Sequence, residues 1–179
     1  MANRIDDTVI RMLRELKACD EGLEWVMEHP KGWSGTRLWE TCKEPMWMLW
    51  FIAQAYHTEL VPRRVNLAVI ELMREPWDST YAGICGLSFD ELFAGDPNSM
   101  HRNFLPEVFD GQHCFWLAMR AYLDGATPVW YTRSALLEHH MHVTGGLSFA
   151  ALDRIDVSIC RALRTVMPYA NLNKRITRR

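Results

Sequence analysis

The sequence predicts an all-α protein, a compact irregular bundle of about eight helices that forms a single domain over residues 1–179. Two observations predict this class. Apolar residues recur at spacings of three and four along most of the chain, and Pro, Gly or Ser residues separate the segments that carry this period. An apolar fraction of 49% and a charged fraction of 23% are ordinary for a folded domain.

Local signals place the first three helices. The first is expected over 4–18, where apolar and charged residues lie on opposite sides of the helix. Asp20 favours the positive end of a second, short helix, which ends before Pro30 because a residue before proline avoids helical angles. Ser34 is expected to cap a third helix.

The next segment, 46–53, is apolar on all sides. Pro45 suits the first position of a helix, so we expect a helix that is wrapped by others, with a buried strand as the alternative. A further amphipathic helix is predicted over 60–75, and Pro76 is expected to close it. The stretch 76–87 contains Pro and Gly and is predicted to be a loop.

Capping and breaking residues divide the rest of the chain. Ser88 and Glu91 form a capping box, and the short helix that they start is expected to stop at Gly95. The stretch 95–106 lacks a clear pattern and is a candidate functional loop. Further helices are predicted over 110–124, from Pro128 to about Val143, and from Ser148 to Pro168, followed by a basic tail at about 170–179.

Composition argues against secretion and membrane insertion. The five cysteines are widely spaced without a Cys-x-x-Cys pair, which favours free thiols in a reducing cytoplasm. Charges interrupt the first sixteen residues, unlike a signal peptide. The longest apolar run, 45–53, is about half of a membrane span. We therefore expect a cytoplasmic protein that does not enter a membrane.

Glu138, His139 and His142 are the strongest candidates for chemistry. On a helix, residues three or four apart share a face, so these side chains could bind zinc or another divalent metal. The order differs from His-Glu-x-x-His, and the alternative is that the histidines complement the negative end of a helix. A closed site would need another ligand, and the sequence offers three without selecting one: His101, Asp110 and His113.

Nucleophilic and nucleotide chemistry have weaker support. Asp110, His113 and Cys114 bring a carboxylate, an imidazole and a thiol together, but neighbours on a helix point about 100° apart, and Asp110 with His113 is as well explained by a helix cap. No glycine pattern for phosphate binding and no Gly-x-Ser-x-Gly sequence is present. The sequence therefore assigns no catalytic residue and no organic cofactor.

Eight tryptophans make the chain rich in indole side chains. Their two interpretations are core packing and an exposed surface that anchors a partner. Trp33 and Trp77 fall in predicted loops beside Gly or Pro, so we expect them near the surface, and Trp130, in a first helical turn, is a third candidate for partner binding. Both interpretations, an aromatic core and an exposed anchor surface, are open for the cluster Trp25, Trp33, Trp39, Trp47 and Trp50.

Cys19 and Trp25, followed by Trp39, Cys42, Trp47 and Trp50, form a pattern that resembles uncharacterised bacterial and phage helical proteins. Its main part is Trp-x2-Cys-x4-Trp-x2-Trp, followed by an Arg-rich helix, and it covers residues 15–75. The resemblance implies a prokaryotic or phage origin and an accessory role, without an activity. The matching residues are Cys19, Gly22, Leu23, Trp25, Trp39, Cys42, Trp47, Leu49, Trp50, Arg63 and Arg64.

Charge is distributed unevenly. Residues 77–127 carry two basic and seven acidic side chains, a net charge of −5, and residues 128–179 carry eight basic and three acidic ones, a net charge of +5. Such a split can steer association with a partner or with a second copy in a homo-oligomer. The leading hypothesis is therefore a non-enzymatic, protein-binding accessory or inhibitor protein.

Two alternatives remain from the sequence. The first is a metal-dependent enzyme built on Glu138, His139 and His142. The second is nucleic-acid binding through the basic C-terminal third, with phosphate contacts that would make binding fall steeply with salt. The basic residues that would carry it are Arg161, Arg164, Lys174, Arg175, Arg178 and Arg179.

Overall fold

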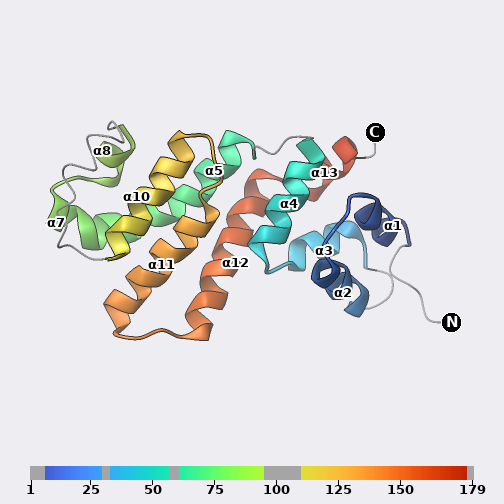
Figure 1. The fold of residues 1–179 in the computed structure, drawn as a ribbon, viewed down its shortest axis with the longest axis horizontal. Coiled ribbons are helices and arrows are strands. Elements are labelled where there is room, and N and C mark those ends of the chain that lie inside the picture. The colour runs from blue at the N-terminus through green and yellow to red at the C-terminus, as the bar shows by residue number, and fades with distance from the viewer. Residues whose placement is uncertain (1–6, 30–32, 57–60, 95–109, 177–179) are drawn as a thin grey trace.

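The computed structural model describes residues 7–29, 33–56, 61–94 and 110–176. Every regular element in these ranges is helical, which confirms the all-α class (Figure 1). No helix in the described part of the chain is both long enough and apolar enough to cross a bilayer. The predicted loop at 95–106 lies outside the described residues.

The N-terminal helices begin and end close to the predicted positions. They are α1 (Asp7–Glu15), α2 (Asp20–Glu28), α3 (Gly35–Thr41) and α4 (Pro45–Tyr56). The Ser34 hydroxyl accepts a hydrogen bond from the Arg37 amide at 3.3 Å, which is the predicted N-cap. The apolar segment 46–53 is helical, as favoured, and its alternative as a strand is excluded.

The predicted loop at 76–87 is the largest error of the sequence-based assignment. After α5 (Arg63–Ile70) the chain stays helical through a 3₁₀ turn, η1 (Glu71–Met73), then α6 (Arg74–Pro76), a π-helical turn, η2 (Trp77–Tyr81), and α7 (Ala82–Cys85). The changes of hydrogen-bond spacing on both sides of Pro76 let the helical path pass a residue that has no N–H to donate. Gly86, with φ of 68°, ends this path.

The capping box at the start of α8 (Phe89–Ala94) is confirmed. Glu91 Oε2 accepts from the Ser88 amide at 2.8 Å, and the Ser88 hydroxyl accepts from the Glu91 amide at 3.3 Å. Gly95, the predicted end of this helix, lies outside the described residues.

The C-terminal half forms α10 (Asp110–Leu123), α11 (Val129–Thr144), α12 (Phe149–Val166) and α13 (Tyr169–Ile176). The first three match the predicted helices. The segment predicted as a basic tail is helical through Ile176, because Leu172 and Ile176 lie on one face of α13 and are buried against the core. Pro168 thus precedes a new helix as well as ending the one before it.

Two clusters of buried side chains hold the bundle together. The first lies among α4, α5, α12 and α13, and the second among η1, η2, α8, α10 and α11. Helix α5 joins them, since Val65 and Val69 belong to the first cluster and Ile70 to the second. The body is accordingly elongated, with α7 and α8 at one end and α1 to α3 at the other (Figure 1).

Candidate functional site

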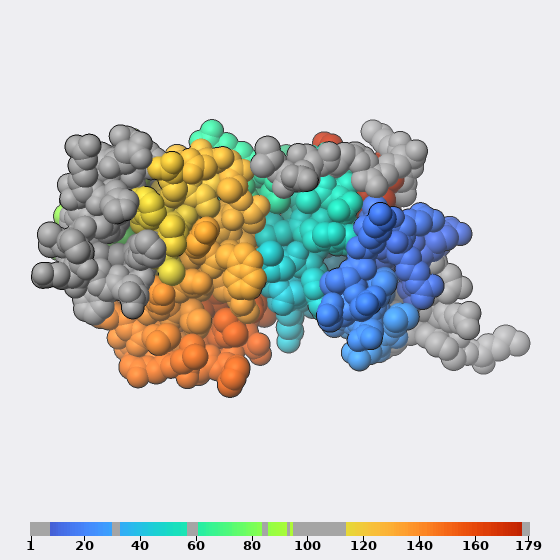
Figure 2. Space-filling model, viewed as in Figure 1, coloured from blue at the N-terminus to red at the C-terminus, as the bar shows by residue number. Residues whose placement is uncertain are grey.

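The α11–α12 hairpin ends in an exposed apolar segment. Here we call residues 141–150 the hairpin tip. Phe149 is 90% exposed, Leu147 65% and Val143 64%, and every residue of the tip is exposed. The two helices run side by side to a loop at the lower edge of the view in Figure 1, and Figure 2 shows this orange region on the open surface. Large apolar side chains gathered in this way mark interaction surfaces.

The tip also lacks charge. No Asp, Glu, Lys or Arg occurs from Val143 to Leu152, although 23% of the chain is charged. Gly145, with φ of 75°, ends α11, and the Ser148 hydroxyl accepts from the Ala151 amide at 3.0 Å to start α12. Because both helix ends are capped locally, the apolar side chains are presented by a defined turn.

A buried ion pair holds the two helices behind the tip together. Arg133 on α11 donates from Nε and Nη2 to the two carboxylate oxygens of Asp156 on α12, both at 2.7 Å. Asp156 is 8% exposed, so this two-bond contact is largely shielded from water. Its geometry fixes the two helices of the hairpin relative to each other.

Of the three predicted metal ligands, His142 belongs to the hairpin tip and Glu138 and His139 precede it on α11, and their side chains face different neighbours. Glu138 Oε1 accepts from the Cys114 thiol on α10 at 3.4 Å. His139 lies 3.4 Å from the Thr80 hydroxyl through Nδ1, and both histidine rings, at 139 and 142, lie against Tyr81 of η2. The Glu138 carboxylate is hydrogen-bonded to α10 and the imidazoles pack on η2, although burial and the nearby Glu138 charge both raise the pKa of the Tyr81 hydroxyl.

These contacts leave the metal hypothesis without a gathered ligand set. Among the described residues, no group of three or more His, Cys, Asp or Glu side chains could hold a metal ion. The helical turn of about 100° per residue directs Glu138 toward α10 and His139 toward η2. His142 shares a face with Glu138 but packs on Tyr81 of η2, while Glu138 is hydrogen-bonded to Cys114. The further ligands considered from the sequence, His101 and the side chains of Asp110 and His113, lie outside the described part of the structure.

His139 makes stability depend on pH. Burial lowers the pKa of its imidazole, Glu75 opposes this shift, and His142 and His140 add to it. Since the folded state binds this proton less readily than the unfolded chain, the stabilising contribution is present above about pH 6.5 and is lost as the pH falls through the lowered pKa.

We expect His139→Gln to flatten the fall in unfolding free energy between about pH 7 and pH 5, measured by urea titration. An unfolding free energy that falls equally with pH in the natural chain and in His139→Gln would contradict the role given to His139.

The predicted tryptophan anchors have three different environments. Trp77 is fully buried and donates from Nε1 to the Leu87 carbonyl at 2.9 Å, so its predicted place at the surface is wrong. The reason is that the helix continues past Pro76 and turns this side chain into the second core cluster. Trp33 is half-buried with the Arg37 guanidinium over its ring at 4.3 Å, and Trp130 is 56% exposed.

The basic residues considered for nucleic-acid binding do not act as one set. Arg164 donates from Nε to the Trp39 carbonyl at 2.9 Å and from Nη2 to the Cys42 carbonyl, so it caps the end of α3. This internal role corrects its assignment to a nucleic-acid surface. Arg175 lies over the Tyr56 ring at 4.1 Å. Arg161 and Lys174 are exposed, and Arg178 and Arg179 lie outside the described residues.

Sequence reasoning missed Phe149 and Leu147. The sequence feature that indicates these two residues is the uncharged stretch around Gly145-Gly146. In it, Leu147 follows the two glycines and Phe149 follows the capping residue Ser148. The sequence predicts only a break between helices there, because periodicity identifies a helical face without showing whether another element covers it. Comparison of the chain with family models, curated proteins and solved structures finds no match.

Proposed function

We propose that this protein is a non-enzymatic binding protein that docks on a protein partner through the hairpin tip. The observation that carries the proposal is the 90% exposure of Phe149 next to exposed Leu147 and Val143. Burying a side chain of this size in a partner's pocket gains about 1.5–3 kcal/mol. The convex tip is suited to enter an apolar groove, where a few aromatic and aliphatic anchors carry most of the binding energy.

A protein surface is a better counterpart than a membrane. Interfacial membrane helices combine an apolar face with many Lys and Arg residues that contact anionic lipid. The hairpin tip has neither Lys nor Arg. The Arg133–Asp156 pair behind it supports a preformed docking element, which lowers the ordering cost of association.

Site-specific photocrosslinking in the cells that naturally express the protein tests the proposal. A benzophenone amino acid at position 149 is expected to give light-dependent adducts of discrete mass with another protein. The same amino acid at Trp130, which is also exposed but lies at the start of α11, is the matched control and should give none of these adducts. Adducts of equal mass and yield from both positions would count against the tip.

A double substitution checks the energetic role of the same side chains. Leu147→Ser with Phe149→Ser should leave the thermal midpoint nearly unchanged, because both side chains are exposed. It should weaken binding of the crosslinked partner, once purified, by at least about 100-fold. Adducts formed only between copies of the chain, or recovery of the protein with lipid vesicles that the double variant loses, would overturn the proposal.

A further inference from the structure

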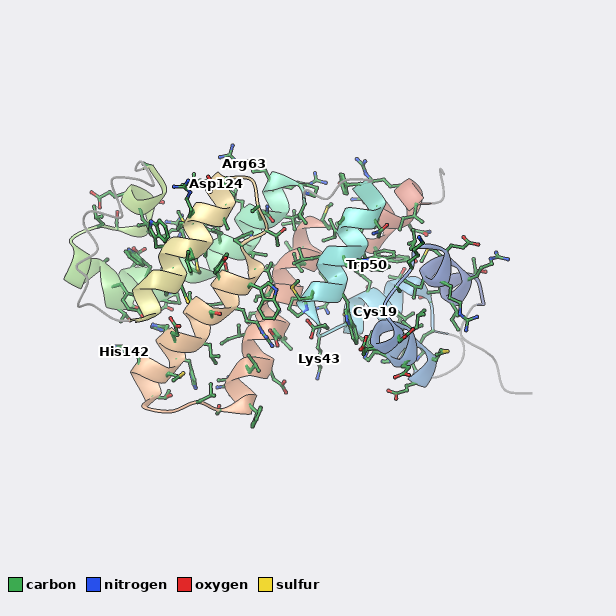
Figure 3. The ribbon with its side chains drawn as sticks, viewed as in Figure 1. Cys19, Lys43, Trp50, Arg63, Asp124 and His142 are labelled. Carbon is green, nitrogen blue, oxygen red and sulfur yellow. The ribbon has the colours of Figure 1, made fainter. Side chains whose placement is uncertain are left out.

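An apolar cavity of about 340 Å³ lies in the N-terminal half, far from the hairpin tip. Helices α1 to α4 form its walls, with Tyr169 of α13, and four tryptophans line it: Trp25, Trp39, Trp47 and Trp50. Figure 3 labels Cys19 and Trp50, which lie near each other between α4 and the α1–α2 pair, while His142, in the hairpin tip, lies at the other side of the molecule. The volume is in the range of sites that hold small organic molecules.

Most residues of the tryptophan and cysteine pattern line this cavity, although Leu23, Leu49, Arg63 and Arg64 do not. Cys19, Gly22 and Trp25 follow one another at a spacing of three at the start of α2 and within it, so they share one face. Trp47 and Trp50 have the same spacing on α4, and the Trp25 and Trp47 ring centroids are 5.7 Å apart. These residues therefore form a wall of the cavity. The sequence analysis predicted either core packing or an exposed anchor surface for the tryptophans, and did not predict a cavity.

Helix α4 is apolar all round because two of its faces have separate roles. Met48, Ile52 and Ala55 are buried in the first core cluster. Trp47 and Trp50 are only half-buried; they pack against the same cluster and also line the cavity, as Met48 does. Because their indole rings also border the cavity, they favour an apolar occupant over a polar one.

Two polar features of the lining narrow the chemistry of that occupant. Trp39 is 6% exposed, and no described residue accepts a hydrogen bond from its Nε1. A buried donor without an acceptor is destabilising, and an acceptor on a bound molecule would satisfy it. Lys17, which is exposed, is the one charged residue among the described residues of the lining. An apolar body with a single anionic acceptor complements both groups.

We propose that the cavity binds a small apolar carboxylic acid, with its hydrocarbon body among the four tryptophans and its carboxylate toward the Trp39 indole N–H and Lys17. The apolar lining supplies most of the contact area, and the two polar groups select the acid over a hydrocarbon of the same shape. This ligand site is independent of the proposed protein-docking function at the hairpin tip.

Calorimetric titration of the full chain with 2-naphthoate tests the proposal, with decanoate in parallel to distinguish aryl from alkyl acids. Saturable binding of either acid at one site per chain supports it. Gly22→Leu should weaken binding at least tenfold, because a Cβ at this position lies 3.9 Å from the Trp47 ring and a longer side chain occupies the cavity. The same Cβ lies 3.3 Å from Cys19 Sγ, which belongs to an exposed side chain that can shift. The substitution replaces a helical glycine, so the thermal midpoint should not fall.

Matched variants separate binding from folding. Gly83→Leu adds the same side chain where a Cβ meets nothing within 4 Å, and it should bind 2-naphthoate as the natural chain does. Trp39→Phe removes the indole donor and should weaken 2-naphthoate about tenfold while changing naphthalene binding little. The Phe149→Ser chain should retain acid binding, which distinguishes this site from the tip. Absence of saturable binding by both acids, or full binding by Gly22→Leu, would overturn the proposal.

Discussion

Replacing Trp77 with alanine is expected to lower the free energy of unfolding by about 3–5 kcal/mol. The side chain is fully buried in the second core cluster, with its ring centroid 5.7 Å from that of Tyr81 and 5.4 Å from that of Phe115. Alanine would remove these contacts, leave a cavity, and leave the Leu87 carbonyl without the indole donor that lies at 2.9 Å.

Trp130→Ala is the matched control, since it removes the same side chain from a position that is 56% exposed. Its unfolding free energy, measured by urea titration with the same protocol, should stay within about 0.5 kcal/mol of the natural chain. Trp77→Phe should lose less than Trp77→Ala, because it keeps most of the ring and loses the hydrogen bond. Similar losses for Trp77→Ala and Trp130→Ala would show that the second cluster is not organised as described.

The second large effect is expected from separating Arg133 and Asp156. Arg133→Met should cost on the order of 3–5 kcal/mol, because it leaves the Asp156 carboxylate, 8% exposed, without its two donors. Since the pair joins α11 to α12, its loss should also loosen the hairpin that presents Phe149. Hydrogen exchange of the α11 and α12 amides would report this loosening directly.

A double-mutant cycle tests whether the pair itself is responsible. Arg133→Met combined with Asp156→Leu replaces both charges with apolar side chains and should recover most of the stability lost in Arg133→Met. Arg120→Met, which breaks the exposed pair with Asp124 at 2.6 Å, is the control and should cost at most about 1 kcal/mol. Equal losses for the Arg133 and Arg120 substitutions would contradict the role given to burial.

Much of the helical framework could be predicted from local sequence. Ser34, Ser88 and Ser148 cap helices at the predicted positions, and α10, α11 and α12 have nearly the predicted bounds. These features depend on hydrogen bonds and side-chain spacing within about four residues, so a short stretch of sequence contains the physical information. The error at Pro76 shows the limit of such signals, because burial of Trp77 and Tyr81 favours a helical path that local propensity disfavours.

Sequence alone therefore determined the all-α class, the helix caps and the richness in tryptophan. Tertiary structure decided which faces other helices cover. In the folded chain Trp77 is buried, Arg164 caps the end of α3, and Phe149 is exposed. A cavity lies among Trp25, Trp39, Trp47 and Trp50. The physical reason is that exposure and cavities depend on contacts between residues far apart in the chain. The spacing of apolar residues along a helix is the same whether the apolar face contacts the core, a ligand or water, so the spacing alone cannot distinguish these cases.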